Sequence, residues 1–212
     1  MSPLTTPFPT TLDASSYQSP GGGALYAPLR DAIVATATAM GYDPSTMVEI
    51  GINWSDDLDP FGHVKNHAYG HFTTACNVRV FHSFETSLGT EKFDDFMHAR
   101  GVGVLVRSST TRWLRPVTFP NALIVAYHLT EVLPDRYFGI TTIWSLRQQA
   151  MGAETSGYMV FFDHGKGKLA DLLEMGGEFR DLYGCLVERM EREGKIAGKW
   201  EVKQSEKKEA KI

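Results

Sequence analysis

The sequence has few cysteines, no long apolar run and no excess of positive charge. Only Cys76 and Cys185 occur among its 212 residues, so a disulfide framework is not expected and a reducing compartment is the default. No apolar run reaches the ~18 residues of a membrane span. The formal net charge of −4 argues against non-specific nucleic-acid binding, which needs a basic field.

The N-terminal region also lacks the features of a targeting segment. The first basic residue is Arg30, whereas a secretory signal begins with a basic segment and a mitochondrial presequence contains arginines. Residues 1–20 are rich in serine, threonine and proline, and three glycines follow them. This composition predicts an extended, flexible leader that buries too little surface to order itself.

A chain of 212 residues is long enough to bury a core of its own, and 42% of these residues are apolar, so one folded domain is expected. We divide the chain into an N-terminal extension (residues 1–46), a core domain (residues 47–164) and a C-terminal helix with a mobile charged tail (residues 165–212). Helical spacing of apolar residues predicts a helix over residues 25–40 of the extension. A second such stripe, from Phe179 to Met190, predicts an amphipathic helix that packs against the core or another subunit.

Within the core domain the apolar period changes from helical to strand-like. We expect a strand over residues 47–54, a long helix over 63–85 and a short helix over 91–98. From Gly103 onward the period is two, with four β-rich runs at residues 103–108, 122–132, 137–147 and 158–163, and with turn signals that include residues 152–157. The order predicts an α+β fold in which an antiparallel sheet curls around the long helix.

The densest polar cluster lies between the first predicted strand and the long helix. Asp56, Asp57 and Asp59 stand at the helix entry, where their simplest role is N-terminal capping worth ~1 kcal/mol. Pro60 fixes the turn, and Gly62 allows close approach of the backbone. A carboxylate beside unpaired amides at a helix start is the combination that acyl transfer needs.

This cluster resembles the signature of the hot-dog-fold acyl-CoA thioesterases, the 4-hydroxybenzoyl-CoA thioesterase-like group. The matching residues are Asp57-x-Asp59-x-x-Gly62-His63-Val64-x-Asn66-x-x-Tyr69. Two weaker matches follow in the family's order, Trp113-Leu114-Arg115-Pro116 and Val160-Phe161-Phe162-Asp163. The resemblance covers roughly residues 47–164 and implies a hot-dog fold, in agreement with the independent assignment of elements above.

The resemblance also implies a set of site residues. Asp59 is the expected catalytic carboxylate, acting as a general base or as a nucleophile. The expected catalytic set is completed by the backbone amides around Gly62, His63 and Val64, which would bind the thioester oxygen, and by Asn66. The expected substrate-binding residues are Asp57, Tyr69, Phe72, Trp113 and Arg115. The segment before the turn contains one acidic residue more than the family pattern, so Asp57 is the alternative catalytic residue. Pro60 directly after Asp59 resembles the hydroxybenzoyl branch of the family, which favours Asp59.

The predicted reaction is hydrolysis of an acyl-CoA thioester to a carboxylic acid and coenzyme A, with no cofactor and no metal. His63, His67 and His71 share one face of the predicted helix at metal-like spacing, but no glutamate follows His63 and no cysteine cluster is near. Two alternatives stay open, a hot-dog enoyl-thioester hydratase and a non-catalytic acyl-thioester-binding protein. A homodimer or homotetramer is expected, because a single curled sheet leaves an edge and a face uncovered.

The last three residues suggest a location. Ala210-Lys211-Ile212 fits the small-basic-aliphatic pattern of the peroxisomal address as a conservative variant. We therefore expect a peroxisomal or a cytoplasmic protein.

Overall fold

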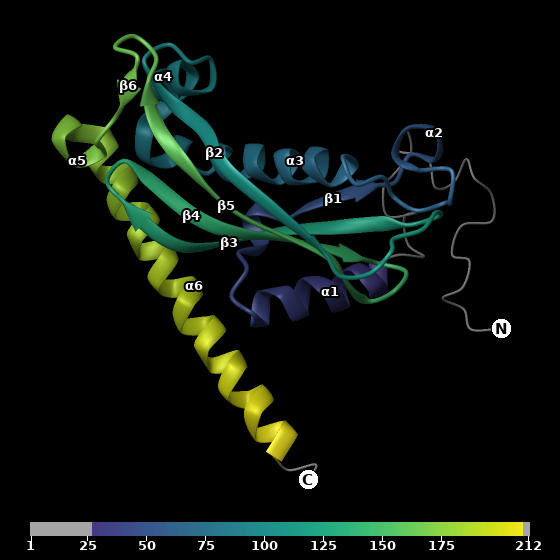
Figure 1. Cartoon of the computed structure of the whole chain (residues 1–212). Helices are drawn as coiled ribbons and strands as arrows, with labels where there is room; N and C mark the ends of the chain where they lie inside the picture. The colour runs from purple at the N-terminus through teal and green to yellow at the C-terminus, as the bar shows by residue number, and fades with distance from the viewer. Residues whose placement is uncertain (1–26, 210–212) are drawn as a thin grey trace.

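The computed structural model describes residues 27–209, which form one sheet flanked by helices (Figure 1). The leader expected over residues 1–20 and the tripeptide at residues 210–212 lie outside the described residues. In chain order the elements are α1 (Ala27–Ala39), η2 (Pro44–Thr46), β1 (Val48–Gly51), α2 (Trp54–Asp57), α3 (Ala68–His82), α4 (Glu85–Met97), β2 (Val102–Trp113), β3 (Ala122–Leu133), β4 (Arg136–Ser145), β5 (Ala150–Asp163), β6 (Lys168–Leu169), α5 (Leu172–Met175) and α6 (Gly177–Glu209).

The sheet has the strand order β1-β3-β4-β5-β2, and each pair of neighbouring strands is antiparallel. β6 pairs with β5 outside this order. Helix α3 lies over one face of the sheet and α1 lies under the other (Figure 1). Within the described residues, β2 therefore forms one edge of the sheet and β1 forms the other. Among residues 27–209, no helix has the length and apolar character that crossing a bilayer requires.

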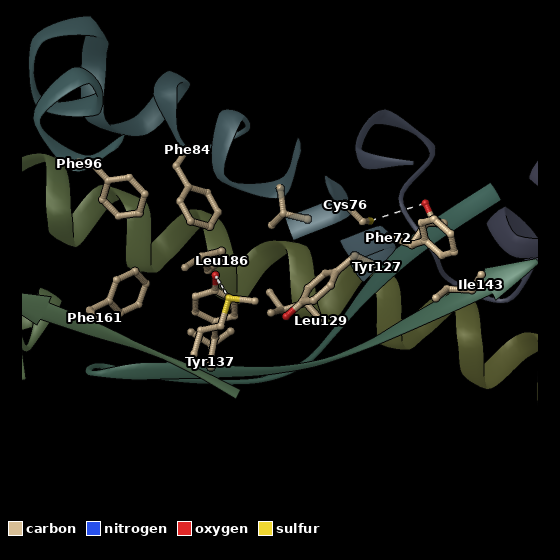
Figure 2. Packing of buried hydrophobic residues seen from close by; sticks show 14 of the residues in the cluster. Phe72, Cys76, Phe84, Phe96, Tyr127, Leu129, Tyr137, Ile143, Phe161 and Leu186 are labelled. Atoms are coloured by element: carbon tan, nitrogen blue, oxygen red, sulfur yellow. Dashed lines mark hydrogen bonds between the residues drawn. The ribbon is translucent and has the colours of Figure 1, made fainter. Parts of the chain in front are cut away.

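The core lies between α3 and the inner face of the sheet. Phe72, Cys76 and Val80 follow each other at intervals of four on α3, and all three are buried. Farther along, Phe84 between α3 and α4 and Phe96 on α4 point toward Phe161 and Tyr137 on the strands (Figure 2). Complete burial of one such side chain contributes about 1.5–3 kcal/mol, so this face of α3 secures the helix to the sheet.

Several predicted boundaries inside the core domain are wrong, and two of the differences have a clear physical cause. Helix α3 begins at Ala68 rather than at His63, because backbone bridges between Leu58 and Val64 and between His63 and Thr118 hold the preceding loop extended. Strand β5 runs through residues 152–157, where a turn is expected from the glycines. Gly157 is required by close packing instead, since a Cβ atom there would lie 2.4 Å from the Ser108 carbonyl oxygen.

The C-terminal segment also differs from its expected form. The chain is helical as far as Glu209, and two charged side chains of α6, Arg189 and Glu193, are buried. Strand β1 pairs only with Ala122 to Val125 of β3, and α6 packs against β3. At Leu129 the β3 backbone N–H donates to Glu193 Oε2 at 2.7 Å. The helix thus covers a stretch of sheet edge that no strand occupies among the described residues.

The two cysteines lie in different environments, which gives a first prediction. Burial raises the pKa of the Cys76 thiol to about 12, whereas Cys185 is exposed on α6. Because the thiolate is the reactive form, we expect one thiol per chain to react quickly with Ellman's reagent and the second to react only after unfolding. The Cys185→Ser variant should lose the fast phase. Two fast thiols in the native protein would contradict the buried position of Cys76.

Candidate functional site

The loop between α2 and α3 is a tight backbone turn that carries the predicted carboxylate. The Asp59 N–H donates to the His63 carbonyl oxygen at 2.8 Å, and the Gly62 N–H donates to the Asp59 carbonyl oxygen at 3.1 Å. Gly62 has φ +78°, in the left-handed region that a glycine adopts without strain. The turn therefore fixes the backbone on both sides of Asp59.

The Asp59 side chain is held by its own loop. Its Oδ1 atom accepts the backbone N–H groups of Phe61 and His63, each at 2.9 Å. Its Oδ2 atom has no hydrogen-bond partner within residues 27–209. One carboxylate oxygen is thus anchored by two amides, and the other is available to a water molecule or a substrate.

A cavity of about 290 Å³ opens beside this carboxylate. Its walls come from the loop, the first turn of α3 and the end of β2. Inside it the rings of Tyr69 and Trp113 meet edge to face, with their centroids 6.4 Å apart. The lining residues are Asp59, His63, Val64, Asn66, Tyr69, Trp113, Leu114, Arg115 and Pro116. Seven of the predicted site residues therefore surround one cavity, although more than forty residues separate the two sequence motifs.

Three other predicted site residues lie outside the cavity lining. The Asp57 Oδ2 atom accepts the Asn53 N–H at 2.7 Å, so this carboxylate braces the start of α2. Phe72 is fully buried in the core, one turn of α3 beyond Tyr69. Gly62 lies in the turn itself, and its role is conformational. Of the two candidate carboxylates, only Asp59 lines the cavity.

The amides expected to bind the thioester oxygen are already paired, which corrects the sequence prediction. Gly62 and His63 donate to Asp59, as described above, and the Val64 N–H donates to the Val117 carbonyl oxygen at 2.8 Å. A helix beginning at His63 would have left these N–H groups without partners, whereas the extended loop pairs all three of them.

Free donors are found one turn later. The backbone N–H groups of Asn66 and His67, directly before α3, have no hydrogen-bond partner in the part of the chain that the structure describes. Asn66 also lines the cavity that contains Asp59. No capping signal in the sequence marks these amides, because the N-cap residue of α3 is His67 and its side chain makes no capping hydrogen bond. The arrangement places an anchored carboxylate and an unpaired amide at the same cavity.

Two further polar groups of the cavity are a neutral phenol and a cation. Burial raises the pKa of Tyr69 to about 12, so its hydroxyl stays protonated near neutral pH. Arg115 is exposed, and its Nη1 atom donates to the Met151 carbonyl oxygen at 3.0 Å. Among residues 27–209 no group of three or more histidine, cysteine, aspartate or glutamate side chains is arranged to hold a metal ion.

A family model and several solved structures are similar to this chain. A family model described as "Thioesterase-like superfamily" matches residues 52–179. No curated protein sequence matches the chain. The similar solved structures include a DHNA-CoA thioesterase from Staphylococcus aureus, with TM-score 0.56 and 15% identity over 70% of this chain and 93% of that one.

Two further structures show the same likeness. A thioesterase from Thermus thermophilus, solved with coenzyme A and zinc, has TM-score 0.52 and 18% identity over 66% of this chain and 92% of that one. The probable thioesterase YbaW from Escherichia coli has TM-score 0.51 and 18% identity over 68% of this chain and 97% of that one. At these identities the likeness shows the fold.

Proposed function

Because this chain belongs to the thioesterase-like superfamily, we propose that it hydrolyses an acyl-CoA thioester to a carboxylic acid and coenzyme A. Membership of the superfamily supports thioester hydrolysis in general. The observation that carries the finer proposal is the geometry at Asp59, where one carboxylate oxygen is anchored by two amides and the other is unpaired within the described residues. The presence of coenzyme A in the similar Thermus structure supports the choice of thioester.

The proposed reaction has two alternative first steps at the same atom. The unpaired oxygen of Asp59 removes a proton from a water molecule that attacks the thioester carbonyl carbon, or it attacks that carbon itself. The second route forms a mixed anhydride and releases the coenzyme A thiolate, and water then cleaves the anhydride. In both routes negative charge develops on the carbonyl oxygen, and the amides of Asn66 and His67 are the donors proposed to receive it. One such donor typically contributes ~3 kcal/mol to the transition state.

A panel of acyl-CoAs tests this function, with thiol release as the signal. The Cys185→Ser protein should be used, since an exposed cysteine would react with the same reagent. Thiol release well above the uncatalysed rate supports the proposal. Loss of enoyl absorbance from crotonyl-CoA without thiol release would instead indicate a hydratase, and calorimetric binding without either reaction would indicate a binding protein.

We also propose that the protein acts as a homodimer joined through β2. Within the described residues this strand is a free edge of the sheet, and three of its large apolar side chains, Leu105, Val106 and Trp113, are exposed. An exposed apolar edge strand of twelve residues readily pairs with a second copy. Light scattering at micromolar concentration should give the mass of a dimer. The Val106→Lys variant should shift it toward a monomer, whereas Ile196→Lys on α6 should not.

A further inference from the structure

A second, smaller cavity lies between α3 and the sheet, apart from the one that contains Asp59. Its volume is about 30 Å³, which is room for roughly one water molecule. Side chains with oxygen atoms line much of it, in contrast to the apolar core on either side. They include Thr73 and Asn77 on α3, Ser109 on β2, Tyr127 on β3, Thr141 on β4 and Thr155 on β5.

Two of these side chains have no partner. Thr73 and Asn77 are 9% and 7% exposed, and within residues 27–209 neither Thr73 Oγ1 nor Asn77 Oδ1 makes a hydrogen bond. Buried polar atoms are nearly always paired, because leaving one unpaired in the interior is costly. Two such atoms, one helical turn apart at the same cavity, indicate that a polar group from outside the chain belongs there.

The sheet contributes a polar wall opposite these two side chains. Gly139 on β4 lies opposite Gly157 on β5. A Cβ atom at Gly139 would be 2.0 Å from the Tyr127 hydroxyl oxygen, so any other residue would displace that hydroxyl from the cavity wall. The glycine thus accommodates the Tyr127 hydroxyl, which makes the sheet side of the cavity polar as well as the helix side.

The polar cavity and the Asp59 cavity share the same two elements. Thr73 follows Tyr69 by four residues on α3, a distance of about 6 Å along the helix axis, and Asn77 is one turn farther. On β2, Trp113 lines the Asp59 cavity, and Ser109, four residues earlier, lines the small polar cavity. The edge-to-face pair of Tyr69 and Trp113 lines the Asp59 cavity, four residues from Thr73 on α3 and from Ser109 on β2, and Trp113 is 49% exposed.

We propose that Thr73 and Asn77 determine the acyl specificity of this protein, by binding a hydroxyl group carried by the acyl chain. This inference rests on the function proposed above. A thioester held at Asp59 would extend its acyl group past Trp113 along α3. A hydroxyl group arriving in the small cavity can donate to Asn77 Oδ1 and accept from the Thr73 hydroxyl. A plain hydrocarbon chain there would leave both atoms unpaired, and a site of this kind discriminates against a substrate that lacks the hydrogen-bonding group.

Matched pairs of thioesters test the proposal. The aliphatic pair is hexanoyl-CoA and 6-hydroxyhexanoyl-CoA, and the aromatic pair is phenylacetyl-CoA and 4-hydroxyphenylacetyl-CoA. In at least one pair, kcat/KM should be roughly 10–100-fold higher for the hydroxylated member, as expected from the net contribution of two hydrogen bonds. The responding pair identifies the kind of chain that carries the hydroxyl. Equal kcat/KM values within both pairs would overturn the proposal and leave the hydrolase function intact.

Variants of Thr73 and Asn77 then test whether these residues cause the preference for the hydroxylated thioester. The double variant T73V/N77L removes both polar atoms at nearly constant size, so the preference should fall to about onefold. Its melting temperature should equal or exceed that of the wild type, because unpaired polar atoms are replaced by apolar ones. The matched control is Thr74→Val, since Thr74 is exposed on the same helix and donates to the Gly70 carbonyl oxygen. A double variant that keeps the preference but melts at a lower temperature would show a purely structural role and overturn the proposal.

A binding measurement separates this inference from the proposed reaction. The Asp59→Asn protein should bind the hydroxylated thioester of the responding pair more tightly by calorimetry, and T73V/N77L in the same background should remove that difference. If no thioester is hydrolysed but this difference in binding is found, the specificity assignment stands and the proposed hydrolase function fails. Absence of any difference in binding would overturn the specificity assignment.

Discussion

Replacing Asp59 with asparagine is expected to lower kcat for acyl-CoA hydrolysis by about 10²–10⁴-fold, the usual contribution of a positioned acid–base group. Asparagine retains an Oδ1 atom that can accept the amides of Phe61 and His63, so the loop should keep its shape. It replaces the unpaired carboxylate oxygen with an amide group that can neither remove a proton nor attack a carbonyl carbon. Steady-state thiol release gives kcat, and a melting curve should show only a small change.

Asp57→Asn is the matched control for this experiment. Asp57 lies two residues away and braces α2 through the Asn53 N–H, and it does not line the cavity. We expect its activity to stay within a fewfold of the wild type. If Asp57→Asn abolishes turnover while Asp59→Asn hydrolyses acyl-CoAs at the wild-type rate, the assignment of the carboxylates is reversed.

The largest expected effect on stability is at Glu193. Its carboxylate accepts the Leu129 N–H at 2.7 Å and pairs with Arg189 Nε at 2.6 Å, and it is only 2% exposed. The Glu193→Ala variant would leave the buried Leu129 N–H without its acceptor. It would leave the buried Arg189 guanidinium with only the Thr46 hydroxyl and the more distant Asp43 carboxylate. Breaking a buried ion pair typically costs about 3–5 kcal/mol of unfolding free energy. For a chain of this length that corresponds to a drop in Tm of roughly 6–20 °C.

A neighbouring exposed pair supplies the control for Glu193. Glu191 is exposed on the same helix and lies 3.6 Å from Lys195, so Glu191→Ala should cost no more than about 1 kcal/mol. Replacing both buried partners, as in R189M/E193L, should restore much of the lost stability, because no unpaired charge then remains. Equal melting temperatures for Glu193→Ala and Glu191→Ala would show that α6 does not depend on this buried pair.

Local sequence patterns predicted much of the fold. The α+β hot-dog fold and the resemblance to thioesterases are confirmed by the sheet, the α3 core and the family match. The helix expected over residues 25–40 is found as α1, with Ile33 and Ala37 buried on its apolar face. The pattern succeeded here because the spacing of apolar side chains directly encodes which face of an element is buried.

The failures occur where distant residues pair. The start of α3 depends on a backbone bridge to Thr118 and a hydrogen bond to Val117, about fifty residues away along the chain. The hydrogen bond to Val117 pairs the Val64 amide, which the sequence predicted to be free. The tail beyond Glu188 looks like a solvated charged segment. It is partly buried because β1 is too short to cover the β3 edge, which leaves the Leu129 N–H in need of an acceptor.

The sequence by itself determined the family of this protein, because the Asp-Pro-x-Gly turn and its flanking motif lie in one local segment. The tertiary structure decided which of the two aspartates faces a cavity, and which amides lack a partner within residues 27–209. It also decided that Thr73 and Asn77 are buried without partners among the described residues. A side chain's chemistry is a property of its residue, whereas its burial and its hydrogen-bond partners depend on segments brought together only when the chain folds.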